Sequence, residues 1–239
     1  MNRRSLIGLA AACLLAAVAL PAASGSSADR AMAILASAKS ASGGAAWDNV
    51  TGWHERGTHG DVAYETLLDL HQEGSLFKET KDGQTSTRGF NGAVAWEQKP
   101  DGQVSQSTEP ARLADARLSW YASASAFFFP ERFPARFADL GKQTDGKTVY
   151  DRLRITPAGG NPFELWIDRS THLVARLVDR TGPKPLTATV GGYEEFDGLK
   201  LPTGFTVGDA TPGHAQQAQI LSYELTPVPR AAFDPPAHP

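Results

Sequence analysis

Polar and apolar residues alternate along two long parts of the chain, one from about residue 45 to 107 and one from about 147 to 228. Alternation with a period of two is typical of β-strands that bury one face. Short turn sequences interrupt the alternation, among them Lys-Asp-Gly, Asn-Gly and Pro-Asp-Gly in the first part. Because such turns join neighbouring strands, the pattern predicts antiparallel meanders.

Two stretches have helical spacing instead. Residues 29–41 carry apolar side chains at i, i+3 and i+4, and a Ser-Gly-Gly sequence ends this predicted helix. Residues 110–129 place Trp120 and Tyr121 at helical positions, and Pro130 ends the pattern. The sequence therefore predicts a helix before the first meander and a second helix between the two meanders.

The sequence ELWIDRSTHLVARLV at residues 164–178 gathers residue types that serve in acid–base and nucleophilic catalysis. Its apolar residues alternate on both sides of a short polar segment, which is typical of a β-hairpin. Asp168 begins that segment, where an aspartate side chain accepts hydrogen bonds from backbone N–H groups of the turn. We therefore interpret this stretch as a hairpin and not as a catalytic cluster.

The first residues have the three regions of a secretory signal. Two arginines precede an uninterrupted apolar run from Leu6 to Leu20, and small residues follow it. A membrane span needs a longer run of about 20 residues. We expect cleavage near Ser24, with 1–24 as the signal peptide and 25–239 as the chain exported to the periplasm or secreted.

Cys13 is the only cysteine, and it offers an alternative to that interpretation. A bacterial lipoprotein signal ends in a cysteine that becomes lipid-modified, but here the apolar run continues past Cys13. The pattern favours cleavage near residue 24. The exported chain then contains no cysteine and needs no disulfide.

Charge and length restrict the partners of the exported chain. Loss of the arginines at 3 and 4 leaves 21 of the 23 basic residues against 26 acidic ones. The resulting charge of about −5 argues against nucleic acid as a partner.

No later stretch is long and apolar enough to span a membrane. With no low-complexity linker inside it, the chain is predicted to form one domain over 25–239, and we expect a monomer.

Motifs for catalysis or for metal binding are scarce. His54 and His59 are five positions apart, which puts them on opposite faces of a strand. The sequence has no G-x-S-x-G nucleophile elbow. The Asp-Thr/Ser-Gly signature of aspartic proteases is also absent. The nearest candidate is Asp179, and there Arg180 stands between the aspartate and Thr181-Gly182. We expect no catalytic residue, no metal and no cofactor.

Three stretches carry a family resemblance: GFNGAVAWEQ at 89–98, the hairpin at 164–178, and GYEEFDGLKLPTGFTV at 192–207. In this order they resemble the LolA/LolB superfamily of periplasmic lipoprotein carriers, and also LolA-like domains that precede aspartic-protease domains. The resemblance implies an α+β fold. In that fold a strongly curved antiparallel sheet forms an incomplete barrel, and helices cover its concave face. Family members hold acyl chains in the apolar hollow between sheet and helices.

The resemblance implies a non-catalytic binding protein of the periplasm whose partner is a lipid acyl chain or a lipoprotein. Two alternatives stay open: a secreted hydrolase or accessory domain of an aspartic-protease system, and an envelope regulator that acts through protein contacts. We expect aromatic side chains to line the hollow, namely Trp96, Trp120, Tyr121, Phe127, Phe128 and Phe129. The three phenylalanines are either core residues at a helix end or a mobile lid over the hollow.

Overall fold

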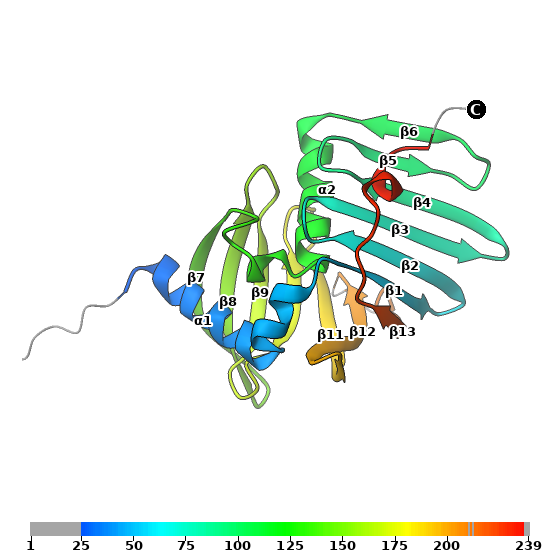
Figure 1. Cartoon of the computed structure of the whole chain (residues 1–239). Coiled ribbons are helices and arrows are strands. Elements are labelled where there is room, and N and C mark those ends of the chain that lie inside the picture. Colours follow the sequence, from blue (N-terminus) through cyan, green and yellow to red (C-terminus); the bar gives the residue numbers. More distant parts are fainter. Residues whose placement is uncertain (1–24, 210, 212, 237–239) are drawn as a thin grey trace, which may run out of the picture.

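The computed structural model describes residues 25–209, 211 and 213–236 (Figure 1). The predicted signal peptide and the alternative lipidation site lie outside these residues. Within them, 13 antiparallel strands form one sheet in the order β6-β5-β4-β3-β2-β1-β13-β12-β11-β10-β9-β8-β7. The strands β6 and β7 end the sheet on its two sides, so the sheet is not closed into a barrel.

The sheet consists of two meanders that meet where β1 pairs with β13. The first meander is β1 (Gly52–His59), β2 (Val62–Asp69), β3 (Gly74–Lys81), β4 (Gln84–Phe90), β5 (Ala95–Gln98) and β6 (Val104–Ser107). The second is β7 (Ala135–Asp145), β8 (Thr148–Pro157), β9 (Phe163–Asp168), β10 (Val174–Asp179), β11 (Leu186–Phe196), β12 (Leu199–Gly208) and β13 (Gln216–Glu224). The first and last strands of the described chain are therefore neighbours in the middle of the sheet.

Five helical segments accompany the sheet: α1 (Ser27–Ala41), η1 (Gly44–Asn49), α2 (Pro110–Ser123), η2 (Ala126–Phe128) and η3 (Arg230–Phe233). A capping box begins α1, in which the side chains of Ser26 and Asp29 accept hydrogen bonds from each other's backbone N–H groups. The helix α1 lies beside β7, and α2 lies between the two meanders (Figure 1). No helix among the described residues is long and apolar enough to cross a membrane.

The stretch at 164–178 is a hairpin, as predicted, because β9 and β10 pair in antiparallel. Asp168 Oδ1 accepts hydrogen bonds from the backbone N–H groups of Ser170 at 2.7 Å and Thr171 at 3.3 Å. These bonds explain why the turn contains polar residues, and no catalytic role is needed to account for them.

Two predicted boundaries are wrong. The second helix was expected to continue to residue 129, but α2 ends at Ser123 and Ser125 adopts a left-handed conformation with φ of 50°. The chain then forms the short η2 instead of a further helical turn. The second meander also begins earlier than expected, with β7. A bulge between Asp139 and Gly141 shifts the alternation of β7 by one residue, which hides the strand from a period-two pattern.

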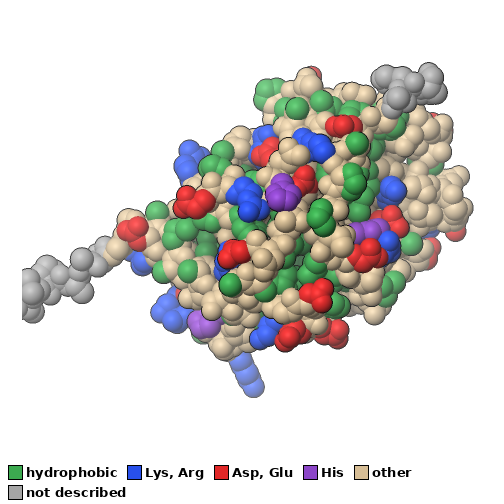
Figure 2. Space-filling model, viewed as in Figure 1, with side chains coloured by type: hydrophobic (Ala, Val, Ile, Leu, Met, Phe, Trp, Pro, Cys, Tyr) green, Lys and Arg blue, Asp and Glu red, His purple; other side chains and the backbone are tan. Residues whose placement is uncertain are grey.

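The largest apolar core lies on one face of the sheet and includes residues of α1, α2 and η2. A smaller cluster of Leu76, Trp96 and Phe233 lies apart from it. The C-terminal segment with η3 runs across the outer side of the first meander, drawn in red in Figure 1, and supplies Phe233. Over the face seen in Figure 2, acidic and basic side chains are interspersed among apolar ones.

Candidate functional site

A hollow of about 970 Å³ opens on the core-facing side of the sheet. Strands of both meanders contribute to its walls, and so do α2 and the side chains of Phe127 and Phe128 in η2. This volume lies near the upper end of the range for small-molecule sites, about 300 to 1,000 Å³. The hollow is therefore large enough to hold a ligand with a long apolar part.

One side of the hollow is apolar and comes from the second meander. We call it the apolar wall and define it by Leu177, Ala188, Val190, Phe205 and Val207, all of which line the hollow. These side chains are neighbours across strands, because Ala188 pairs with Leu177 on β10 and with Val207 on β12. The wall is thus continuous over β10, β11 and β12, where a hydrocarbon chain can contact it along its length.

The first meander contributes charged side chains to the hollow, next to apolar ones such as Leu68 and Phe77. His59 Nε2 lies 2.9 Å from Glu79 Oε1, and Arg88 Nη2 donates to Glu79 Oε2 at 3.4 Å. The ring of Tyr64 stacks between His59 and Phe77, with centroid distances of 6.1 Å and 5.8 Å. Glu79 therefore contacts an imidazole and a guanidinium that also line the hollow.

A second carboxyl group, that of Glu55, lies at the boundary between the two meanders. Tyr64 Oη donates a hydrogen bond to Glu55 Oε1 at 2.9 Å, and Glu55 pairs in register with Tyr223 on β13. Burial raises the pKa of Glu55 to about 7, although the hydrogen bond from Tyr64 acts in the other direction. A partly buried carboxyl with a raised pKa in a cavity is a feature of functional sites.

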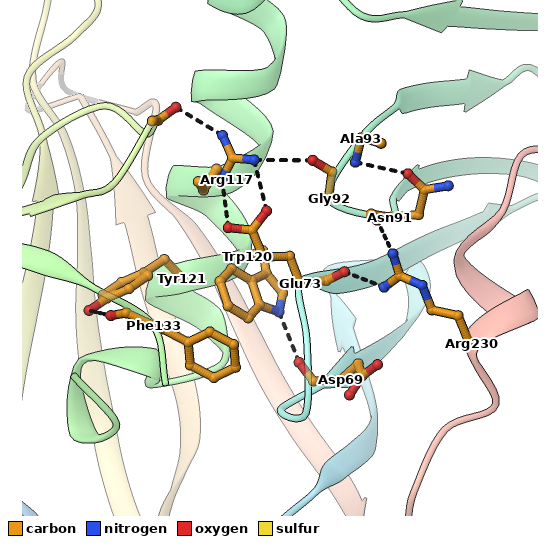
Figure 3. A network of polar contacts seen from close by, with 11 residues as sticks. Asp69, Glu73, Asn91, Gly92, Ala93, Arg117, Trp120, Tyr121, Phe133 and Arg230 are labelled. Carbon is orange, nitrogen blue, oxygen red and sulfur yellow. Dashed lines mark hydrogen bonds and ion pairs between the residues drawn. The ribbon is translucent and has the colours of Figure 1, made fainter. Parts of the chain in front are cut away.

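The helix α2 is tied to the sheet by Arg117 (Figure 3). The guanidinium donates to both carboxylate oxygens of Glu73, at 2.6 Å and 2.8 Å. It also donates to the carbonyl oxygens of Gly159 at 3.0 Å and Gly92 at 3.1 Å. Arg230 of the C-terminal segment donates to the carbonyl oxygen of Glu73 on the same turn. The side chain of Arg117 alone therefore connects α2 to turns of both meanders.

Trp120 and Tyr121 are buried beside this network. Trp120 lines the hollow, and its Nε1–H donates to the carbonyl oxygen of Asp69 at 3.1 Å. Tyr121 Oη donates to the carbonyl oxygen of Phe133 at 3.2 Å, and Tyr121 lines a separate small cavity beside Phe133. The structure thus places Trp120 at the hollow and Tyr121 behind it.

The three phenylalanines at the end of the helical block are buried, with exposed fractions of 2% to 7%. Phe127 and Phe128 pack edge to face with ring centroids 4.7 Å apart, and both line the hollow. Phe128 also packs on Trp47 at 5.2 Å. Phe129 packs against Trp47 at 6.4 Å and lies under Lys39 and Arg132. In this structure they are core residues, two of which also line the hollow.

Trp96 belongs both to the lining of the hollow and to the smaller apolar cluster with Leu76 and Phe233. Its neighbour Ala95 packs against the main core, and side chains alternate along a strand, so the Trp96 indole points to the outer face. There its Nε1–H donates to the carbonyl oxygen of Phe233 at 2.8 Å. The indole also lies across Gly89, where a Cβ would be 2.1 Å from a ring carbon. The Trp96 side chain therefore anchors the C-terminal segment.

Sequence reasoning missed Glu55, Tyr64 and Tyr223. The alternation of the strand could have indicated Glu55, because it follows the buried Trp53 by two positions and therefore shares its inward face. His54, on the other face, lies 3.8 Å from Glu65 Oε2, so the two histidines of β1 are separated as predicted. In the part of the chain that the structure describes, no three His, Cys, Asp or Glu side chains are arranged to hold a metal ion.

No protein-family model matches the chain, and no curated protein matches it. Solved structures do match over most of its length. The LolA superfamily protein of Nitrosomonas europaea aligns with a TM-score of 0.54 and 15% identity, covering 85% of this chain and 97% of that one. A DUF1329 family protein of Desulfovibrio piger aligns with a TM-score of 0.58 and 13% identity, covering 88% and 98%.

A third match is the putative outer membrane lipoprotein-sorting protein domain of Vibrio parahaemolyticus, with a TM-score of 0.55 and 12% identity. It covers 87% of this chain and 97% of that one. These likenesses confirm the LolA-like fold that the three sequence stretches predicted, with a large open antiparallel sheet and few helices.

Proposed function

We propose that this chain is an exported, non-catalytic carrier that holds the acyl chain of a lipid or a lipoprotein in its hollow. The observation that carries the proposal is the apolar wall, which runs without interruption over three strands inside a cavity of about 970 Å³. The likeness to LolA-type structures supports the same use of the hollow.

The energy available from the apolar wall is sufficient for reversible binding. Each methylene group transferred from water contributes about 0.8 kcal/mol. Ten methylenes along the wall then contribute roughly 8 kcal/mol before the entropy cost of association is subtracted. A carrier must release its cargo, and binding of this strength, without a covalent step, is compatible with release.

We further propose that α2 and η2 act as the cover of the concave face. Both elements contribute side chains to the hollow from the side opposite the sheet, among them Trp120, Phe127 and Phe128. Of the six aromatic residues expected to bind the ligand, we keep these three as ligand contacts. Tyr121, Phe129 and Trp96 then support the cover and the outer face, because their side chains pack elsewhere.

A bulky side chain in the apolar wall tests the proposal. Ala188→Trp places an indole between Leu177 and Val207, which fills the space that a hydrocarbon chain needs. We expect uptake of a fluorescent C16 fatty acid analogue to fall at least tenfold, measured by fluorescence titration of the purified chain.

Thr189→Trp is the matched control, because Thr189 is the next residue of β11 and points to the other face. It adds the same side chain to the same strand outside the hollow and should leave uptake unchanged. Equal uptake by both variants, with both folded by circular dichroism, would contradict the proposed site. Native mass spectrometry of protein purified from the periplasm adds a direct observation, since a carrier is expected to retain lipid. An envelope regulator that acts only through protein contacts would carry none.

A further inference from the structure

The polar groups beside the apolar wall form a defined cluster. We call it the carboxyl–tyrosine cluster, and it consists of Glu55, Tyr64, Tyr193 and Tyr223, all of which line the hollow. They come from β1, β2, β11 and β13. Register shifts in β11 between Val190 and Tyr193 bring both side chains to the hollow, so the cluster borders the apolar wall. A ligand whose chain lies on the wall can therefore place its head at the cluster.

Close backbone packing sets the position of Tyr64. Its ring lies over Gly57, where a Cβ would be 2.5 Å from two ring carbons. Any larger residue at position 57 would push the ring away. The glycine therefore lets the ring lie flat on β1 with its hydroxyl 2.9 Å from Glu55 Oε1. This arrangement places the phenol and the carboxyl in the hollow together.

Each tyrosine hydroxyl has already donated its single proton. Tyr64 donates to Glu55, Tyr193 to the carbonyl oxygen of Val174 at 2.6 Å, and Tyr223 to the carbonyl oxygen of Pro202 at 2.9 Å. A hydroxyl that has donated its proton offers only lone pairs. The cluster therefore presents acceptors to the hollow and needs a ligand that donates hydrogen bonds.

The cluster also lacks a positive charge. Among the described residues, Glu55 takes part in none of the ion pairs, whereas Glu79 in the same hollow contacts both His59 and Arg88. Burial raises the pKa of Glu55, which is the expected response of a carboxyl that has lost water and gained no cation. A cation from the ligand would complete the pair that the chain does not supply.

We propose that the carboxyl–tyrosine cluster binds the primary ammonium head of a single-chain amphiphile whose hydrocarbon chain lies on the apolar wall. The ammonium group has three N–H donors and one positive charge, which match the free oxygens of Glu55, Tyr193 and Tyr223. This inference rests on the proposed carrier function and specifies the ligand for the same hollow. A neutral head leaves the carboxyl without a counter-ion, and an anionic head is repelled by it.

Isothermal titration calorimetry with three ligands of equal chain length tests the inference on the unmodified chain. We expect dodecylamine to bind at least about tenfold more tightly than dodecanol at pH 8, a difference of about 1.4 kcal/mol. Dodecanoic acid should bind more weakly than dodecanol. If dodecanol binds but dodecylamine has no advantage, the inference fails and the carrier function stands. If none of the three binds, the carrier function itself fails.

Proton release gives a second readout, because the ammonium group takes the place of the proton on Glu55. Other charged or titratable groups line the hollow and must be included in the analysis: His59, Glu79, Arg88, Glu97, Arg112, Asp115, Asp179, Lys200 and the three tyrosines of the cluster. At pH 6.5, titrations in buffers of different ionisation enthalpy should show release of up to about one proton per dodecylamine bound. Dodecanol should release none.

Glu55→Gln removes the charge and keeps the size of the side chain. It should weaken dodecylamine binding about tenfold, abolish the proton release and leave dodecanol binding unchanged. Glu79→Gln is the matched control, because that carboxyl already has its basic partners. Unchanged proton release in Glu55→Gln would overturn the inference, and so would an equal loss of dodecylamine binding in both variants.

Discussion

Arg117 is the residue whose removal should loosen α2 most. Its side chain is 16% exposed and that of Glu73 is 28% exposed, so the pair is largely shielded from water. Arg117→Ala removes four hydrogen bonds and leaves the Glu73 carboxylate without its main partner. Breaking a fully buried pair costs about 3 to 5 kcal/mol. Because this pair is partly exposed, we expect a loss of about 3 kcal/mol in the free energy of unfolding.

The measurement is thermal unfolding followed by circular dichroism, together with hydrogen exchange of the α2 amides. For a chain of this size a loss of about 3 kcal/mol lowers the Tm by roughly 6 to 12 °C. Arg117→Lys keeps the charge but loses the two-pronged contact with Glu73, so its effect should be intermediate. The amides of α2 should exchange faster than those of β8 in both variants.

Arg112→Ala is the control, because Arg112 is an exposed residue on the same helix. It should change the free energy of unfolding by less than about 0.5 kcal/mol. A double-mutant cycle with Glu73→Gln should give a coupling of about 1 to 3 kcal/mol between Arg117 and Glu73. A Tm within 2 °C of wild type for Arg117→Ala, or a coupling near zero, would refute the view that this network holds α2 in place.

Two further predictions concern side chains in the hollow. Phe128→Asp places an unpaired charge between Phe127 and Trp47 and should cost about 4 kcal/mol or unfold the chain in a thermal melt; Leu221→Asp, at a residue 63% exposed, should not. The pKa of Glu55 is raised from 4.5 to about 7 in the folded chain, so stability falls as the pH rises between these values. Glu55→Gln should therefore be more stable than wild type by about 3 kcal/mol at pH 8 and equal to it at pH 4, measured by urea unfolding.

Local features of the structure could be predicted where neighbouring residues decide them. The β9–β10 hairpin follows from alternation on both sides of Asp168, whose side chain bonds only to its own turn. The first helix follows from the spacing of its apolar residues, although it begins at Ser27 and not at residue 29. Both depend on contacts between residues close in sequence, and such contacts leave a readable pattern.

The errors occurred where the local pattern is interrupted. The alternation in β7 changes phase at the bulge near Gly141, so no period-two signal covers the whole strand. The residues after Ser123 are still of types that are common in helices. Ser125, however, adopts a left-handed conformation that ends α2, and the chain continues as η2. Trp96 has the spacing of a strand residue, and that spacing does not say which face of the strand is inside.

The sequence by itself determined most strands, the presence of two helices and the likeness to LolA-type folds, because periodicity and turn residues act over a few positions. Only the tertiary structure decided that the two meanders join through β1 and β13. The pairing of β1 with β13 brings Glu55 beside Tyr223 from the far end of the chain, and the C-terminal segment covers Trp96 on the outer face. The local pattern places Glu55 on the same face as Trp53. That the carboxyl lies between distant strands with no cation of the described residues beside it depends on tertiary structure, which no local pattern of residues records.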